Sequence, residues 1–384
     1  RGALTLKVSL AMGKHTASAM VPAGRSTGSR EAKELRDEGT RAMSSAILGV
    51  NTEIAKLLKR MPFDPIEIDE ALIELDGTKD KSRLGANALI GVSMALRRLA
   101  AAKEGIPLWK YIAKESRSTP SYPKLYVNML NGGAHADFRL PFQEYIVVVG
   151  GRTPSESYRK VQAIFGALGT EVRKRYGTVP MGDEGGYSPA LSGVEKPLEL
   201  LSRVTEDEAE VFLALDVAAS QFYRSGKYFV GSAPLSRDEF LSLLADLAKK
   251  FKIRSIEDPF EENDYAGFAM AMKKLGGKAL IVGDDLTVTN PRVVRECIKG
   301  NLANALLVKP NQVGTLMEVY DACTSARNAG WKLVVSHRSG ETMDDFIADL
   351  AVGLGAYGLK AGAPSQAERR AKYERLAAIE SEMA

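Results

Sequence analysis

Residues 332–341 of the chain read KLVVSHRSGE, an apolar run that ends abruptly in groups that favour water or an anion. The apolar residues 333–335 are typical of a short strand that is buried on both faces. The next six residues, SHRSGE, are polar or charged apart from one glycine. A buried strand with this ending indicates a binding site at the carboxyl end of the strand.

The same design recurs through the second half of the chain. Short runs rich in Val, Ile and Leu end in polar residues at Asp216, Glu257, Asp284, Lys309 and Lys360. Between the runs lie stretches with helical spacing, such as SRDEFLSLLADLAKKF (236–251), which opens with a capping box. Alternating strands and helices predict parallel strands, and in such barrels the catalytic groups sit at the carboxyl ends of the strands.

Length and local pattern predict two domains of an α/β chain. A (β/α)8-type barrel takes about 250 residues, which leaves a smaller α+β segment in a chain of 384. The stretch ALTLKVSLAMGKHTASAMV predicts two strands around Gly13, and 44–60 and 85–105 have helical character. The connector ESRSTPSYPKLYV is rich in Ser and Pro. We therefore expect an N-terminal lid and capping domain at 1–119 and a catalytic barrel at 120–384.

Composition excludes several classes of function. The net charge of +4 is small, and no basic block with interleaved aromatics predicts a nucleic-acid partner. No apolar run reaches the ~20 residues that a membrane span requires. Cys297 and Cys323 have neither disulfide nor metal spacing and are interpreted as core thiols. We expect a cytoplasmic protein.

Asp216, Glu257 and Asp284 follow three successive predicted strands. Three carboxylates at one barrel mouth repel each other unless a cation balances them. Oxygen ligands without Cys or His favour Mg²⁺ over Zn²⁺. The simpler interpretation of each is a solvated strand end or a helix cap. The repetition on three strands favours a magnesium site.

The cationic strand ends suggest a base and an anion cradle. Lys309 follows four apolar residues and is either a snorkelling surface group or, beside bound cations and an apolar wall, a base of lowered pKa. Lys360 offers a second cation. Arg338 presents a fork suited to phosphate or carboxylate, and Ser336 and Ser339 add hydroxyls. The alternative for SHRSGE is a plain surface turn.

Two glutamates are candidate acids. Glu184 lies in MGDEGGYSP, and Glu144 heads the run QEYIVVV. In a crowded acidic mouth either carboxyl could keep a raised pKa and act as an acid, although Glu144 alone is more often a surface residue. His135, in NGGAHADF, stands beside paired glycines and is by itself more often a structural hydrogen-bonding group.

The combined motifs resemble the enolase (phosphopyruvate hydratase) family. They occur in the family's order over nearly the whole chain: VPAGRSTGSREAKELRD, NGGAHAD, QEY, GDEGGYSP, LDVAAS, SIEDPF, GDDLTVTNP, LVKPNQVGTL, SHRSGET and KAGAP…ERRAKYERLAAIE. SHRSGET with SIEDPF and GDDLTVTN is specific to true enolases. The superfamily is known for a Lys or His base with one or two Mg²⁺ ions.

The resemblance implies a role for each matching residue. Two Mg²⁺ ions are implied, with Asp216, Glu257 and Asp284 as the first metal site and Ser26 of a mobile loop completing the second. Lys309 is implied as the base, and Glu184, with Glu144 beside it, as the acid. The implied substrate-binding residues are His135, Arg338, Ser339 and Lys360, with Ser336 and His337 in the same signature.

The lid motif departs from the family pattern. Arg25 stands where a small residue usually precedes the loop serine, and Ala23 replaces a serine. A bulky cation on a closing lid either hinders closure or adds a contact to an anion. Neither substitution touches the barrel-mouth residues.

The implied reaction is the reversible dehydration of 2-phosphoglycerate to phosphoenolpyruvate in a homodimer, as is common in the family. No nucleic acid is required. Two alternatives stay open: a superfamily relative that dehydrates acid sugars, and a non-catalytic binding protein on the same scaffold. The anion cradle argues against the first, and the intact base, acid and carboxylates argue against the second.

Overall fold

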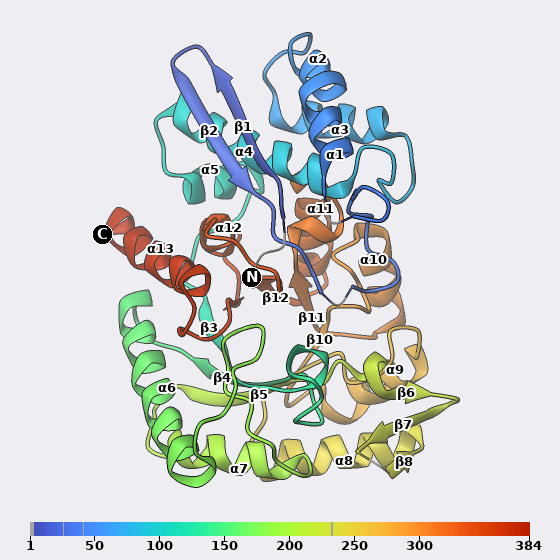
Figure 1. The fold of residues 1–384 in the computed structure, drawn as a ribbon, viewed down its shortest axis with the longest axis vertical. Coiled ribbons are helices and arrows are strands. Elements are labelled where there is room, and N and C mark those ends of the chain that lie inside the picture. The colour runs from blue at the N-terminus through green and yellow to red at the C-terminus, as the bar shows by residue number, and fades with distance from the viewer. Residues whose placement is uncertain (1–3, 26, 41, 232) are drawn as a thin grey trace.

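The computed structural model spans residues 1–384 and describes residues 4–25, 27–40, 42–231 and 233–384 (Figure 1). Near the N-terminus β1 (Lys7–Met12) and β2 (His15–Met20) form an antiparallel hairpin. Gly13 joins them with a φ of 59°, a left-handed conformation that glycine adopts without steric cost. The predicted pair of strands is confirmed.

Helices complete the N-terminal part: α1 (Ser44–Gly49), the π-helix η1 (Val50–Ile54), α2 (Ala55–Leu58), α3 (Pro65–Asp76), α4 (Ala86–Glu104) and α5 (Leu108–Glu115). Helix α3 starts at Pro65, and Asp64 accepts hydrogen bonds from two backbone N–H groups of its first turn. Helix α4 packs on the hairpin and ends at Gly105, which is left-handed. Both helical stretches predicted here are confirmed.

Eight strands close into a barrel within the described residues. Their order around the ring is β10-β11-β12-β13-β3-β4-β5-β9. The strands are β3 (Lys124–Asn131), β4 (Glu144–Val149), β5 (Val211–Asp216), β9 (Ser255–Glu257), β10 (Leu280–Gly283), β11 (Ala305–Val308), β12 (Lys332–Ser336) and β13 (Gly358–Lys360). The sequence expectation of a barrel of the enolase kind is confirmed.

The expectation of parallel strands is wrong for β4. This strand pairs antiparallel with both β3 and β5, whereas the other pairings of the ring are parallel. Between β3 and β4 lies only the short 3₁₀ helix η2 (Gly133–Ala136), and a parallel return needs a longer crossover, usually an α-helix. The reversal brings the start of β4, at Glu144, to the mouth where the neighbouring strands end.

Helices surround the ring: α6 (Pro154–Tyr176), α7 (Glu195–Val204), α8 (Arg237–Lys250), α9 (Tyr265–Leu275), α10 (Pro291–Gly300), α11 (Leu316–Asn328), α12 (Phe346–Gly353) and α13 (Ala367–Met383). The predicted capping box of α8 is present, with Ser236 and Glu239 bonding reciprocally. A small sheet of β6 (Tyr223–Arg224), β7 (Lys227–Val230) and β8 (Ala233–Leu235) lies beside α8. In Figure 1 α13 packs against α6 at one side of the barrel.

The period-two alternation of strands explains where the chemistry sits. On β4, Ile146 and Val148 belong to an apolar cluster inside the ring, and Glu144 lies on the same face nearer the mouth. On β5, Ala214 belongs to the same cluster, and Asp216 follows two residues later. The interior is thus apolar below and charged at the mouth. The alternate strand residues pack outward against the helices.

Candidate active site

Strand register places three predicted carboxylates side by side. Glu144 on β4 lies opposite Asp216 on β5, and Asp216 lies opposite Glu257 on β9. All three are buried, with at most 4% of each residue exposed. Lys360, at the end of β13, points its Nζ at them, 3.2 Å from Glu144, 3.1 Å from Asp216 and 2.7 Å from Glu257. One ammonium therefore balances part of a concentrated negative charge.

At the ends of β11 and β10, the predicted base Lys309 forms an ion pair with Asp284, the third predicted metal ligand. The Nζ of Lys309 lies 2.5 Å from Oδ2 of Asp284, and Gln312 donates to Oδ1 of Asp284 at 3.0 Å. Burial alone would lower the pKa of Lys309, but Asp284 outweighs it and raises that pKa. The fall in pKa that the sequence suggested is absent here because a carboxylate faces the amine.

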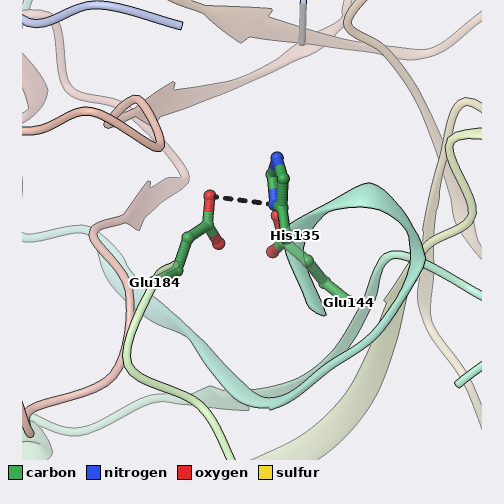
Figure 2. A group of neighbouring side chains, drawn as sticks. All are labelled: His135, Glu144 and Glu184. Carbon is green, nitrogen blue, oxygen red and sulfur yellow. Dashed lines mark ion pairs between the residues drawn. The ribbon is translucent and has the colours of Figure 1, made fainter. Parts of the chain in front are cut away.

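Glu184 lies in a loop that returns to the barrel mouth beside β3. Its Oε1 is 3.5 Å from Nδ1 of His135 and 3.5 Å from Nε2 of His337, and Asn128 donates to its Oε2 at 2.8 Å. Figure 2 shows His135, Glu144 and Glu184 turned toward one another, with ligand atoms of the three within 4.8 Å. The two predicted acids and the imidazole of His135 therefore form one buried group.

The surroundings of Glu144 and Glu184 shift the pKa values of these two carboxyl groups. Burial, and then the negative charge of Glu184, raise the pKa of Glu144 well above its usual range. Burial lowers the pKa of His337 to about 3, so this imidazole is neutral at physiological pH. A buried carboxyl group that keeps its proton is a suitable general acid. Burial would raise the pKa of Glu184, but His337 and then His135 outweigh it and hold that pKa well below its usual range. The proton that the pair can hold at the mouth therefore lies on Glu144.

Arg338 and Ser339 lie where β12 meets the N-terminal segment. The guanidinium of Arg338 contacts both carboxylate oxygens of Glu31 at 3.1 Å and donates to Asn311 at 2.9 Å. The Oγ of Ser339 accepts from the backbone N–H of Arg25 at 2.8 Å. Ser336 is buried and donates to the carbonyl of His337 at 3.0 Å.

Arg25 closes the lid segment onto the acid-bearing loop. Its Nη1 lies 2.7 Å from Oδ2 of Asp183, the residue before Glu184. Backbone hydrogen bonds between Ala23 and Gly340 fasten the same segment to the loop after β12. The predicted ligand Ser26 lies outside the described residues.

The predicted acid, base and substrate-binding residues line one hollow, whereas the predicted metal ligands Glu257 and Asp284 are not among its lining residues. The lining consists of His135, Glu144, Glu184, Lys309, Ser336, His337, Arg338, Ser339 and Lys360, together with Gln143 and Asp216. Gln143 was not predicted, and it donates to Oδ2 of Asp216 at 2.9 Å. Glu31 lies in the motif VPAGRSTGSREAKELRD, and the sequence predicted no role for it. Only its contact with Arg338, across the two domains, reveals one.

The donor atoms at the mouth fit a hard cation. Asp216, Glu257 and Asp284 offer only carboxylate oxygens, which suit Mg²⁺. Oε1 of Glu257 is buried without a hydrogen-bond partner among the described residues, as expected of an atom that awaits a cation. Behind Asp284, the side chain of Asp258 accepts from the backbone N–H groups of Asp284 and Asp285, which fixes the strand end.

Fold and site together define a class of protein: barrel enzymes in which lysines and carboxylates at the strand ends act on a small anionic substrate. The chain belongs to the enolase family. Residues 1–112 match the enolase N-terminal domain, and residues 120–384 match the enolase C-terminal TIM barrel domain.

Curated relatives agree over the full chain. The chain is 44% identical to an enolase of Thermococcus gammatolerans and 43% identical to one of Pyrococcus furiosus, in each case over 100% of this chain and 92% of the relative. An enolase of Methanopyrus kandleri is 43% identical over 93% of its length. None of the helices in the described part of the chain is long and apolar enough to cross a membrane.

Proposed function

We propose that the chain catalyses the reversible, Mg²⁺-dependent dehydration of 2-phosphoglycerate to phosphoenolpyruvate, as a hydro-lyase of glycolysis and gluconeogenesis. The observation that carries this proposal is the position of Lys309 on the opposite side of the ring from Glu144 and Glu184. Strand β4, which bears Glu144, is four positions from β11, which leads to Lys309, in a ring of eight. A base and an acid so placed can act on opposite faces of one substrate.

Lys309 is the base in this proposal. Deprotonated, it would remove the proton next to the substrate carboxylate, which leaves a doubly charged enediolate. The ion pair with Asp284 holds its Nζ at the mouth, and the apolar strand β11 behind it fixes the direction of approach. A positioned base of this kind typically contributes 10²–10⁴-fold to the rate.

Glu184 is the acid, with Glu144 beside it. Glu184 would protonate the leaving hydroxyl with a proton drawn from Glu144, because the pKa of Glu144 is raised well above its usual range and that of Glu184 is held well below its own. His135 and His337 flank Glu184, each with a ring nitrogen 3.5 Å from Oε1 of its carboxylate. Lys360, Arg338 and Ser339 would bind the anionic ends of the substrate, because each presents N–H or O–H donors at the hollow.

We propose two Mg²⁺ ions for each site, with Asp216, Glu257 and Asp284 holding the first and Ser26 contributing to the second. When bound, these ions stabilise the negative charge that develops on the substrate carboxylate. Lys360 adds a fixed positive charge to that of the ions, and this charge belongs to the protein itself. We further propose a cytoplasmic homodimer with domains at 1–119 and 120–384. Dehydration of acid sugars is not favoured, because the family match covers both domains.

The test is direct. Purified protein with 2-phosphoglycerate should produce the ultraviolet absorbance of phosphoenolpyruvate when Mg²⁺ is present and should not when a chelator replaces it. Acid sugars with a proton next to the carboxylate serve as competing substrates. Turnover of an acid sugar without turnover of 2-phosphoglycerate would overturn the proposal.

A further inference from the structure

The guanidinium group of Arg369, on α13, is fully buried, and each of its five N–H groups has an acceptor. Arginine has five N–H donors and no acceptor. The structure supplies five acceptors: Gln366 Oε1 at 3.2 Å from Nε, Arg338 O at 2.6 Å and His337 Nδ1 at 2.5 Å from Nη1, and Ser339 O at 2.8 Å and Asp183 O at 3.2 Å from Nη2. Each contact is therefore a donation from Arg369.

This assignment fixes the state of one imidazole. Because Arg369 can only donate, Nδ1 of His337 must accept and carries no hydrogen. A neutral imidazole then holds its hydrogen on Nε2. That nitrogen lies 3.5 Å from Oε1 of Glu184. The ring therefore presents an N–H, and not a lone pair, to the proposed acid.

We infer that Arg369 is a positioning residue that holds His337 in the Nε2–H tautomer, so that this N–H faces Glu184 and the ring takes no proton during the reaction. The role given to Glu184 rests on the proposed function. The tautomer rests on hydrogen-bond geometry alone. The same guanidinium binds carbonyl groups of two loops, one bearing Arg338 and the other Glu184, so it sets the distance between them.

The surroundings of His337 agree with a neutral ring. The charged groups that face it are Glu184, Arg369 and Lys360. Burial disfavours the imidazolium, and the two cations add to that effect against the single carboxylate. The guanidinium of Arg369 contacts the ring directly through Nδ1, and its positive charge opposes protonation of His337.

The neutral, fixed ring of His337 limits which group can give a proton to the leaving hydroxyl. Protonation of His337 at Nδ1 would place two donors against each other at 2.5 Å. His337 is therefore not the source of the proton that leaves with the hydroxyl. Of the two proposed acids, Glu184 faces this ring, and it lines the hollow together with Glu144.

The chain is convenient for a direct test, because it contains three histidines, His15, His135 and His337. Protein labelled with ¹⁵N only in histidine gives one two-bond proton–nitrogen pattern for each ring, which distinguishes protonated from bare nitrogens. Loss of signals in His15→Gln and His337→Gln assigns the rings. We expect His337 to show a bare Nδ1 and a protonated Nε2, unchanged between about pH 5 and 8. A protonated Nδ1 or an imidazolium in this range would overturn the inference.

Substitutions then test whether Arg369 is the cause. In Arg369→Met the ring should show both tautomers or begin to titrate, and kcat should fall about 10–100-fold, by analogy with the loss of a group that orients a metal-binding histidine. Arg369→Lys, which keeps a donor, should restore part of both. The neighbour Arg370, with long contacts of 3.4 Å to Pro364 and Ser365, provides the control Arg370→Met.

The outcomes are separable. A wild-type tautomer pattern in folded Arg369→Met would show that the ring is set by something else and would overturn the role of Arg369. If Arg369→Met does not fold, the wild-type and Arg369→Lys spectra decide. None of these spectra depends on turnover, so failure of the dehydration assay would remove the proposed function without changing the tautomer result.

Discussion

Replacing Glu31 with glutamine tests how the N-terminal segment restrains Arg338, the arginine that we propose binds the anionic substrate. Glu31 is 8% exposed and Arg338 is 3% exposed, and both oxygens of the one carboxylate contact the guanidinium. Glu31 also accepts from the backbone N–H of Gly28 and from Gln312, each at 3.2 Å. Glutamine keeps the shape but removes the charge that balances Arg338.

The expected size of the effect follows from burial. Breaking a buried ion pair by removing one partner typically costs about 3–5 kcal/mol, because the other charge stays buried without compensation. Asn311 still accepts from Arg338 at 2.9 Å, which places the expectation at the lower end, at about 3 kcal/mol. An anion that binds Arg338 should recover part of this loss, since ligand at 100 times its Kd adds about 2.7 kcal/mol.

The assay is urea unfolding followed by circular dichroism, with and without a phosphate-bearing substrate analogue. Glu34→Gln is the matched control, because Glu34 lies on the same segment and pairs with Arg36 at the surface, where such pairs contribute about 0–1 kcal/mol. The analogue should stabilise Glu31→Gln more than wild type. Equal stability of Glu31→Gln and Glu34→Gln would refute the claim that this carboxylate holds Arg338.

Three further predictions address the metal, the lid and acid stability. Asp284→Asn should weaken Mg²⁺ binding measured by calorimetry, because it replaces a charged oxygen ligand; unchanged affinity would remove Asp284 from the metal site. Arg25→Ala should raise KM by no more than about fivefold, since an exposed pair such as Arg25 with Asp183 contributes at most ~1 kcal/mol; a rise in kcat would instead mean that Arg25 hinders closure. Asp37 accepts from two N–H groups at the start of α1, which lowers its pKa to about 2. The extra stability of wild type over Asp37→Asn should be full above about pH 4 and vanish as the pH falls through about 2, and a constant difference would count against the cap.

The sequence predicted the strand-end residues because each lies directly after a short apolar run. Asp216 and Glu257 lie on adjacent strands of the ring, and Lys360 lies on β13, three positions from β5. The alternation of strand side chains alone sends them to the mouth. The sequence pattern of the strands did not show that β4 runs antiparallel to its neighbours, because the direction of a strand depends on the length of the connection before it and not on the residues of the strand. Glu144 was therefore predicted without a reason for its place at the mouth.

Contacts between segments that are far apart in the sequence left no local signal. Glu31 and Arg338 are 307 residues apart, and Arg369 reaches Asp183 across 186 residues. Each residue sits in a polar helical or loop segment where a charged side chain would ordinarily face solvent. Only the packing of the N-terminal segment and of α13 against the barrel buries them and turns them into partners of the site.

The chemistry is tested most directly by hydrogen exchange at C2 of 2-phosphoglycerate, followed by proton NMR in deuterated water with saturating Mg²⁺. Glu184→Gln should exchange this hydrogen while forming little phosphoenolpyruvate, because removal of the proton precedes loss of the hydroxyl and does not need the acid. Lys309→Ala should do neither, with folding of both variants checked by circular dichroism. Exchange that survives in Lys309→Ala and disappears in Glu184→Gln would contradict the assignment of base and acid.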